Sequence, residues 1–154
     1  MVQRTIKLHL NGKPAELTAE DDTPLIYLLR HDCDLKGTRL GCGANQCGAC
    51  HVLIDGQSLP ACDTPLWAVD GKQVITVEGL GSADQLHPLQ QAFLDEQAAQ
   101  CGYCSSGMLI GAAALLQRNP KPTETEVRAA LDKHLCRCGA HNRIVRAVLK
   151  AAQA

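Results

Sequence analysis

The sequence predicts an α+β protein in which a β-rich N-terminal half is followed by an all-helical C-terminal half. Short, partly alternating apolar stretches in the first half are separated by Asn-Gly and Asp-Gly dipeptides, a pattern typical of β-hairpins. From Ser82 onward these signals stop, and apolar residues recur at helical spacing instead. We therefore expect a boundary near Gly81, with one domain over residues 1–80 and a second over residues 81–154.

The N-terminal half contains two predicted hairpins, one helix and one further strand. The segments TIKLHL and AELTA flank Asn11-Gly12, and HVLIDGQSLPAC turns at Asp55-Gly56. Both dipeptides suit the positive φ angles of a tight hairpin turn. Between the hairpins, PLIYLLRHD predicts a short helix that begins at Pro24, since proline is well tolerated in a first turn. The segment QVITVEGL predicts another strand.

The C-terminal half is predicted to be helical throughout. The uncharged stretch Gln97–Gln117 has the apolar centre MLIGAAALL, which is too short to cross a bilayer and indicates a buried helix. The segment NPKPTETE ends this helix with two prolines, and Thr123 three residues before Glu126 is a capping-box pattern that begins the next helix. The apolar positions at helical spacing form three further series: Leu86, Leu89 and Phe93; Val127, Ala130, Leu131 and His134; and Ile144, Ala147, Val148 and Ala151.

Composition and charge argue against several classes of function. At 154 residues and 45% apolar, the chain is long enough to bury a core. No run of like charge stands out among its 15 basic and 16 acidic residues, and it has one Trp, two Tyr and one Phe, so we expect no nucleic-acid partner. The N-terminus MVQRTIKLHLNGK has no apolar segment of a secretory signal. We therefore expect a cytoplasmic protein without direct membrane insertion.

Nine cysteines are the most informative feature of the composition. The odd number and the absence of a predicted secretory signal argue against a disulfide framework and favour thiolates that bind metal. Eight of the nine fall into two groups, one of Cys42, Cys47, Cys50 and Cys62, the other of Cys101, Cys104, Cys136 and Cys138. Two groups of four predict two metal sites.

The first group lies mostly in the glycine-rich segment GCGANQCGAC. Its spacing of Cys, four residues, Cys, two residues, Cys, with a fourth cysteine later, is that of plant-type [2Fe-2S] ferredoxins. Glycine permits the unusual φ angles and the close backbone approach that such a loop needs. A phosphate-binding loop is excluded, because Ala49 and Cys50 stand where lysine and serine or threonine would be required. Zinc stays open as an alternative, although four-cysteine zinc sites usually join two close pairs.

The second group is split between QCGYCSSGM and LCRCGAHN. One pair of cysteines precedes a predicted helix, and the other pair follows the next helix, so two helix ends would have to meet at the metal. Cys136 and Cys138 are separated by a single residue, which is awkward for one tetrahedral ion. A cluster whose two irons share four thiolates can accommodate this spacing.

Together the two motifs resemble those of the small iron–sulfur subunit of molybdenum hydroxylases, the xanthine oxidase and aldehyde oxidoreductase superfamily. GCGANQCGAC with Cys62 is similar to the ferredoxin-like cluster loop of this family, and QCGYC with CRCG is similar to its helical cluster motif. The resemblance covers nearly the whole chain. In detail the chain most resembles small subunits of bacterial enzymes that hydroxylate N-heteroaromatics such as nicotinate or isoquinoline, and similar proteins also serve aldehyde dehydrogenases.

The resemblance implies a β-grasp ferredoxin-like domain followed by a four-helix bundle, each holding one [2Fe-2S] cluster through its group of four cysteines. It further implies an electron-transfer subunit that passes electrons from a molybdopterin centre, in a large partner subunit, to a cytochrome c-type or flavin acceptor. The implied substrate is an N-heteroaromatic compound or an aldehyde. In this family pattern the Gln100 side chain and the Cys138 sulfur lie against the pterin, so electrons enter at the C-terminal cluster and leave through the N-terminal one.

Three positions depart from the family pattern. Asn45 replaces a glycine, His51 replaces a threonine, and Ser105-Ser106 replaces Thr-Pro. We expect Asn45 to adopt the left-handed conformation that asparagine tolerates. His51 could donate toward the cluster or point to solvent, and we expect it to point to solvent. We expect Ser105 or Ser106 to cap the helix that follows.

Several conspicuous residues outside the two groups are assigned structural roles. Cys33 is predicted to be a buried free thiol, Trp67 to pack in the core or at an interface, and His87 to begin a helix. His141 lies near the second group but lacks the two-histidine pattern of a Rieske centre, so it is not predicted to bind metal. No residue of this chain is predicted to be catalytic.

Two functions from other classes remain as alternatives. A standalone two-cluster ferredoxin would explain the clusters, although it does not need the helical domain. A zinc-stabilised interaction module would explain only the cysteines.

Overall fold

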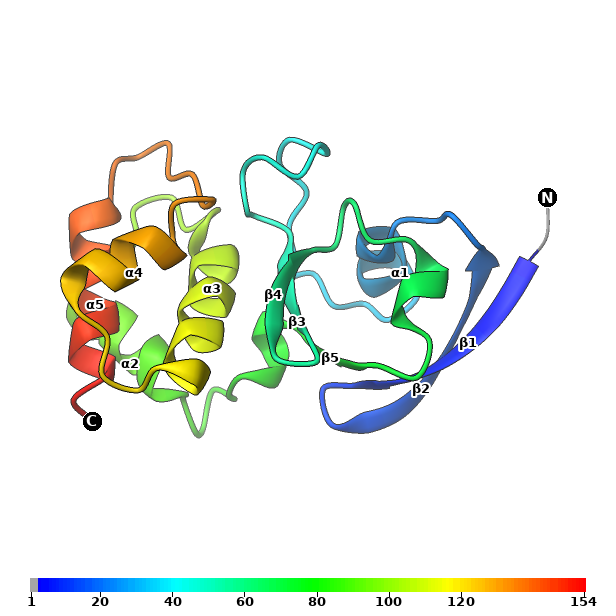
Figure 1. The fold of residues 1–154 in the computed structure, drawn as a ribbon, viewed down its shortest axis with the longest axis horizontal. Helices are drawn as coiled ribbons and strands as arrows, with labels where there is room; N and C mark the ends of the chain where they lie inside the picture. Colours follow the sequence, from blue (N-terminus) through cyan, green and yellow to red (C-terminus); the bar gives the residue numbers. More distant parts are fainter. Residues whose placement is uncertain (1–2) are drawn as a thin grey trace.

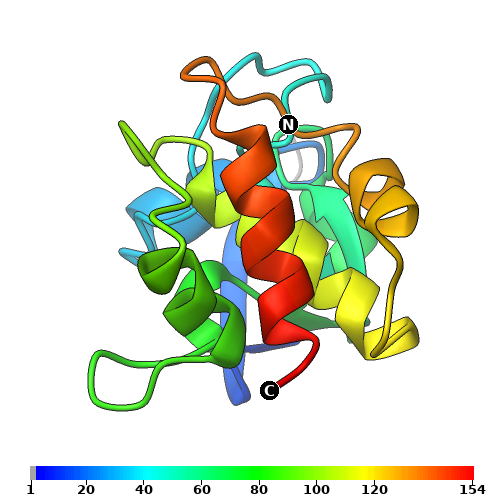
Figure 2. The same cartoon turned by 90° about the vertical axis from the view of Figure 1, so that its left-hand side faces the viewer.

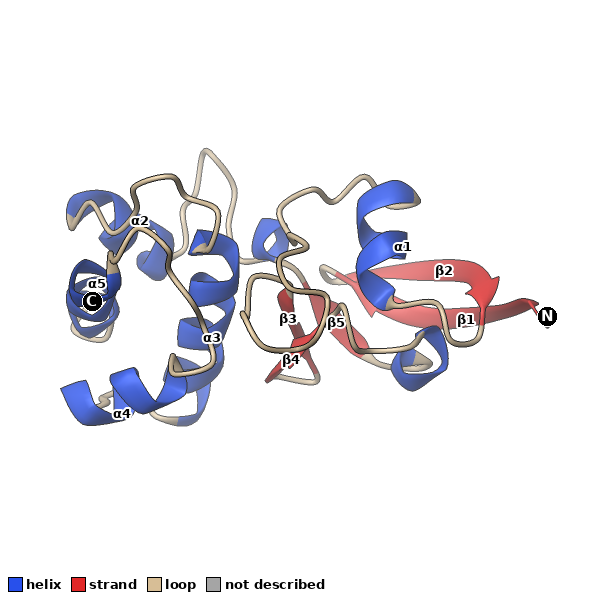
Figure 3. Ribbon diagram, turned by 90° about the horizontal axis from the view of Figure 1, so that it is seen from above, coloured by secondary structure: helices blue, strands red, loops and turns tan. Residues whose placement is uncertain are grey.

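A computed structural model describes residues 3–154 as a sheet half and a helical half that lie side by side (Figure 1). Helix α1 (Leu25–His31) belongs to the sheet half, and the helical half consists of α2 (Pro88–Asp95), α3 (Ser105–Arg118), α4 (Glu124–Ala130) and α5 (His141–Ala151). The separation of strands from these four helices is clear from above (Figure 3). The predicted α+β architecture is confirmed.

Over the described residues the sheet has five strands in the order β2-β1-β5-β3-β4. Strands β1 and β5 run parallel, and the other neighbouring pairs are antiparallel. The bounds are β1 Gln3–Leu10, β2 Lys13–Glu20, β3 His51–Ile54, β4 Gln57–Pro60 and β5 Gln73–Ile75. Helix α1 buries Leu25, Ile26 and Leu29 in one cluster with Ile6 and Val52 of the sheet. A sheet wrapped around one helix in this way is the expected ferredoxin-like arrangement.

Both predicted hairpin turns form. Asn11 and Gly12 have φ angles of 50° and 79°, and Asp55 and Gly56 have φ angles of 48° and 81°. These are the left-handed values that a tight two-residue hairpin turn requires. The first hairpin pairs Gln3–Leu10 with Lys13–Glu20 along its whole length.

Strand β5 is shorter than the predicted segment QVITVEGL. It ends at Ile75, because the Thr76 N–H donates to Asn11 Oδ1 at 2.9 Å instead of to a neighbouring strand. The Asn11 amide also donates to Thr76 Oγ1 at 3.0 Å. The chain then makes a short 3₁₀ turn over Val77–Gly79, so the first hairpin turn determines where the last strand stops.

The helices begin mostly where the sequence predicts. At the start of α2, the Leu89 N–H donates to His87 Nδ1 at 3.1 Å, which confirms His87 as a helix start. At the start of α4, Thr123 and Glu126 form the predicted capping box. The α4 helix ends at Ala130, so the predicted helical series extends too far when it includes His134.

The expected serine cap of α3 is wrong. Cys104 holds the cap position, while Ser105 and Ser106 lie inside the first turn of the helix. A capping side chain has to precede the first turn in order to reach its free N–H groups. Both serine hydroxyls are buried and lack a hydrogen-bond partner among the described residues.

Strand β3 and helix α3 form the seam between the two halves. Every residue of β3 is buried, with Val52 and Ile54 in the core of the sheet half and Leu53 in the core of the helical half. Helix α3 lies at the centre of the helical half and is buried continuously from Ser106 to Leu115. Figure 2 looks onto this half with α5 nearest the viewer and the strands behind α3.

Glycine allows the two backbones to approach closely at the seam. A Cβ on Gly107 of α3 would lie 2.9 Å from the carbonyl carbon of Gly48 and would overlap the carbonyl oxygen. One turn further along α3, a Cβ on Gly111 would lie 2.6 Å from Nε2 of the buried His134. Small residues on one face of α3 therefore set the distance between the halves.

We predict that Gly107→Ala destabilises the protein although alanine favours helices. The propensity gain is about 1 kcal/mol, whereas the new methyl group meets backbone that no rotamer change can move aside. We expect a net loss of about 2 kcal/mol, which would lower the thermal midpoint by about 4–8 °C for a chain of this size. The control is Thr125→Ala at an exposed position of α4, expected to change stability by at most about 0.5 kcal/mol. An unchanged midpoint for Gly107→Ala would contradict this account of the seam.

Candidate metal centres

The loops that carry the two groups of cysteines lie at the same edge of the molecule. This edge is at the top of Figures 1 and 2, where the loop of residues 41–50 approaches the loops of residues 97–104 and 131–140. The first loop belongs to the sheet half, and the other two belong to the helical half. The fold thus brings the two predicted sites near each other across the seam.

In the first group, backbone N–H groups donate hydrogen bonds to cysteine sulfur atoms. The N–H groups of Ala44 and Gln46 donate to Cys42 Sγ at 3.3 Å and 3.2 Å, and the Cys42 N–H donates to Cys47 Sγ at 3.4 Å. The bonds from Ala44 and Gln46 lower the pKa of Cys42 to about 7. Gly41 leaves room for sulfur, since a Cβ there would lie 2.6 Å from Cys47 Sγ. Backbone N–H donors to thiolate sulfur are a common feature of iron–sulfur sites.

In the second group, backbone N–H groups also donate hydrogen bonds to cysteine sulfur atoms. The Tyr103 N–H donates to Cys101 Sγ at 3.5 Å, and the Ala140 N–H donates to Cys136 Sγ at 3.4 Å. The bond from Tyr103 lowers the pKa of Cys101. In contrast, burial raises the pKa of Cys104 to about 12. Burial likewise raises the pKa of Cys50 in the first group to about 12.

The burial of thiols gives a bound metal a role in folding as well as in chemistry. With a pKa of about 12, the thiols of Cys50 and Cys104 are protonated at neutral pH in the absence of a cation. A metal held by these residues would displace the protons, and its binding free energy would then contribute to the stability of the folded state. The backbone N–H groups that donate to Cys42 and Cys101 also favour metal binding, because they stabilise the thiolate form of these cysteines.

Within each group the thiols lie close enough in pairs for each pair to influence the pKa of its members. The pairs are Cys42 with Cys47, Cys50 with Cys62, Cys101 with Cys138, and Cys104 with Cys136. Over residues 3–154, no three His, Cys, Asp or Glu side chains are gathered around a position for a single ion. Two pairs per group suit a cluster of two irons, in which each iron takes two thiolates. The donor sets therefore fit two [2Fe-2S] clusters.

Left-handed residues occur repeatedly in these loops. A glycine with positive φ directly follows four of the cysteines, at Gly43, Gly48, Gly102 and Gly139. Asn45 has a φ of 54°, so the expected left-handed asparagine is confirmed. Such residues let a short loop reverse direction and turn several N–H groups toward one point.

The remaining predicted residues are placed as follows. Gln100 is exposed directly before the exposed Cys101, and Cys138 is partly buried. Cys33 lies just after α1, half-buried at the border of the sheet core and outside both groups, and burial raises its pKa. Trp67 is 52% exposed, so packing in the core is wrong and packing at an interface remains a prediction.

The expectation that His51 points to solvent is wrong. Its side chain is buried, with 6% exposure, and its Nδ1 lies 2.7 Å from Ser58 Oγ. Its ring packs edge-on against the ring of His134, with 4.6 Å between centroids. Burial lowers the pKa of each imidazole to about 4, so both are neutral at pH 7. The difference arises because β3, which His51 begins, is buried by α3 on the side facing the helical half.

Contacts that the sequence did not predict join the two loops. Arg39 donates to the Gly102 carbonyl and lies over the Tyr103 ring, 5.4 Å from its centroid. Tyr103 in turn donates from its hydroxyl to the Leu40 carbonyl at 2.6 Å. The tyrosine inside QCGYC could have indicated such a contact, since a buried or interfacial tyrosine hydroxyl usually forms a hydrogen bond.

Comparisons with known protein families agree with this geometry. Residues 8–78 match the family described as 2Fe-2S iron-sulfur cluster binding domain, and residues 76–149 match the family described as [2Fe-2S] binding domain. Fold and site thus define a protein with two consecutive domains of the [2Fe-2S]-binding class.

The similar proteins narrow the class to one family. The chain is 51% identical to a nicotinate dehydrogenase subunit of Pseudomonas putida, covering 99% of this chain and 97% of that protein. It is 45% identical to the alpha subunit of isoquinoline 1-oxidoreductase from Brevundimonas diminuta, covering 96% and 97%. Among solved structures, quinoline 2-oxidoreductase of Pseudomonas putida aligns with a TM-score of 0.94 at 37% identity, over 99% of this chain and 95% of that one. The chain belongs to the family of small [2Fe-2S] subunits of molybdenum hydroxylases.

The same fold also occurs within a longer polypeptide. The aldehyde oxidoreductase of Desulfovibrio desulfuricans aligns with a TM-score of 0.93 at 39% identity, over 97% of this chain but only 17% of that chain. The two-domain unit is therefore found both as a protein of this length and as one part of a larger enzyme.

We predict four irons and no stoichiometric zinc per chain, with Cys33 outside both sites. Cys47→Ser should lose or damage the N-terminal cluster, because serine oxygen replaces a thiolate whose position Gly41 and the Cys42 N–H prepare. Cys33→Ser is the matched control and should leave the iron content unchanged. Iron and zinc analysis with visible absorption and electron paramagnetic resonance would measure both effects. Loss of a cluster in Cys33→Ser would refute the ligand assignment.

Proposed function

We propose that this chain carries electrons to an external acceptor from a molybdenum centre in a large partner subunit. The cysteines proposed to hold one cluster are Cys42, Cys47, Cys50 and Cys62, in a domain over residues 1–80, and those for the other are Cys101, Cys104, Cys136 and Cys138, in a domain over residues 81–154. When bound, each cluster supplies a site that takes up and releases a single electron. The rest of the function depends on where the chain places these two sites.

The observation that carries the proposal is a hydrogen bond between the two cysteine loops. The Leu135 N–H donates to the Cys47 carbonyl at 2.9 Å. Cys47 is a proposed ligand of the first site, and Leu135 directly precedes Cys136, a proposed ligand of the second. One backbone hydrogen bond therefore connects the two ligand sets, and the contacts of Arg39 and Tyr103 hold the same loops together. This short connection supports transfer between the sites.

The proposed docking face for the large subunit is the part of this edge around the C-terminal group of cysteines and the seam, and it leaves the outer rim of the first loop uncovered. Three large apolar side chains are exposed there, Leu40 by 37%, Tyr103 by 50% and Leu135 by 61%. An apolar cavity of about 310 Å³ beside them is lined by cysteines of both groups. Apolar and aromatic side chains of this kind are enriched at the centres of protein interfaces. The names of the relatives, which are subunits of larger enzymes, support the same arrangement.

For the order of transfer, we propose that electrons enter at the C-terminal site and leave through the N-terminal site. Gln100 and Cys101 are exposed side by side, and Gln100 can both donate and accept hydrogen bonds, as a contact to a pterin requires. Cys138 is proposed to serve both as an iron ligand and as a contact to the pterin. The exposed rim of the first loop, around Cys42, is then free to face a cytochrome c-type or flavin acceptor.

The proposed substrate of the complex is an N-heteroaromatic compound, with an aldehyde as the second choice. The nicotinate, isoquinoline and quinoline enzymes among the similar proteins support the first class, and the aldehyde oxidoreductases support the second. We place the complex in the cytoplasm, because two sets of unpaired thiols need reducing conditions until they bind metal. Among helices of residues 3–154, none is long and apolar enough to cross a membrane.

We predict that Leu135→Ser weakens association with the large subunit. Burying a leucine contributes about 1.5–3 kcal/mol, so its loss should raise the dissociation constant by about tenfold or more. The control is Leu94→Ser on α2, another leucine with 64% exposure, which should leave association unchanged. Co-purification from the native host and analytical ultracentrifugation would measure the effect, with iron content checked in both variants. A stable, fully active population of the isolated chain would instead support a standalone ferredoxin.

We predict that Gln100→Ala slows the arrival of substrate electrons without preventing cluster assembly. Alanine removes a hydrogen-bonding contact to the pterin but leaves every cysteine in place. The matched control is Gln85→Ala, at an exposed position before α2. Rapid reduction with substrate, followed by electron paramagnetic resonance of each cluster, would separate the two sites. The proposed order is wrong if electrons reach the Cys42 site at the normal rate in an intact complex that lacks the Cys101 cluster.

A further inference from the structure

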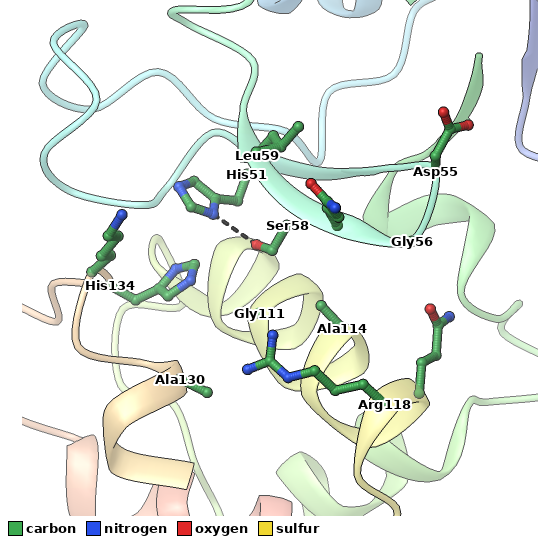
Figure 4. Close-up of a pocket in the computed structure, with 13 residues that line it drawn as sticks. His51, Asp55, Gly56, Ser58, Leu59, Gly111, Ala114, Arg118, Ala130 and His134 are labelled. Carbon is green, nitrogen blue, oxygen red and sulfur yellow. Dashed lines mark hydrogen bonds between the residues drawn. The ribbon is translucent and has the colours of Figure 1, made fainter. Parts of the chain in front are cut away.

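A second cavity lies in the seam between the two halves, away from the proposed docking face (Figure 4). Its volume is about 590 Å³. The β3–β4 hairpin forms one wall, the face of α3 that carries Gly111 and Ala114 forms another, and the segment after α4 forms the third. The small residues of α3 leave this space open, because neither fills it with a long side chain. The volume is within the range of small-molecule sites, which often occur between domains.

The charges around this cavity are unbalanced. Arg118, at the end of α3, and Lys133, after α4, both line it, and neither forms a salt bridge within residues 3–154. Asp55 is the carboxylate on the wall, but it pairs with Lys72 at 2.9 Å and accepts a hydrogen bond from the Gln73 N–H at 3.0 Å. The two cations of the cavity therefore lack a protein counter-ion.

Figure 4 shows how Arg118 lies relative to the cavity, which Lys133 also lines. The Arg118 side chain extends from the C-terminal end of α3 back toward Gly111, so its guanidinium lies alongside the helix face that lines the cavity. An arginine fork presents several N–H donors in one plane and binds carboxylate or phosphate through two parallel hydrogen bonds. A lysine ammonium adds a compact charge with three donors.

Neutral hydrogen-bonding groups of both halves complete the lining. Ser58 on β4 lies at the wall with its hydroxyl 2.7 Å from Nδ1 of the buried His51. Gln57 on β4 and Gln117 on α3 also line the space, and both can donate from their amides. The helical half thus supplies the charges, and both halves supply neutral donors.

We propose that this cavity binds an oxyanion, a carboxylate or phosphate group, between Arg118 and Lys133. The group can belong to a free small molecule or to an acidic side chain of the large partner protein, since both present the same chemistry. The binding does not depend on the cluster assignments or on the order of electron transfer, because no cysteine lines the cavity. A bound oxyanion would contact both halves and stabilise the seam between them.

The test uses the full chain loaded with its clusters, with inorganic phosphate and citrate as probes and chloride at equal ionic strength as the reference. We expect saturable binding of phosphate or citrate by calorimetry. In NMR spectra the backbone amide chemical shifts of Gly56, Gln57 and Gln117 should change on binding. The thermal midpoint should also rise with probe concentration, as ligand linkage requires. The double variant Arg118→Gln, Lys133→Gln should weaken binding about tenfold or more, since each removed charge takes away charge-assisted hydrogen bonds.

The matched control is Lys121→Gln, which removes an exposed lysine in the turn before α4 that does not line the cavity. It should bind the probes like the unmodified chain. The proposal is overturned if neither probe binds saturably, if binding survives the double variant, or if Lys121→Gln weakens it equally. Iron content and unfolding midpoints without probe would establish that each variant is folded.

A second arm distinguishes the two sources of the oxyanion. The same titration is carried out on the native complex with the large subunit, comparing the unmodified chain with the double variant. Binding that persists in the complex and depends on Arg118 and Lys133 supports a free small molecule. Binding that disappears on assembly, together with weaker assembly of the double variant, supports a partner carboxylate. Unchanged assembly and no binding in the complex would rule out both sources in the assembled protein.

Discussion

The close approach of two glycine backbones across the seam is the constraint on which the rest of the structure depends. Gly48 lies in the first cysteine loop between Cys47 and Cys50, and Gly107 lies three residues after Cys104 in the second group. Where these backbones touch, the separation of the two proposed metal sites is fixed by main chain rather than by flexible side chains. Electron transfer weakens steeply with distance, so a rigid separation of this kind suits the proposed function.

The same seam accounts for the features that a local interpretation of the sequence placed wrongly. His51 looks like an exposed residue after a cysteine, yet β3 is buried on both faces and carries its ring against His134. His134 fits the helical series that precedes it, yet α4 ends at Ala130 and the histidine fills space that Gly111 leaves open. Both errors arise because the second face of β3 is covered by residues more than 50 positions away in the chain.

The sequence by itself determined the features that depend on local geometry. Asn11-Gly12 and Asp55-Gly56 form hairpin turns because their φ angles are a property of the dipeptide, and Thr123 caps α4 because its partner is three residues away. Cysteine spacing and family resemblance together indicated the division into two groups of four and the class of protein. The structure brings members of each group close together, and that placement supports their proposed role as ligands.

Only the tertiary structure decided the relations between the halves. These are the hydrogen bond from Leu135 to Cys47, the contacts of Arg39 and Tyr103, the burial of the two histidines and the cavity beside Arg118. Each joins residues that are distant in the chain, and their identities alone do not specify which face of α3 meets which face of β3. The pairing of these faces is decided by the packing of the two cores against one another. Their packing brings the backbones of Gly48 and Gly107 together at the seam.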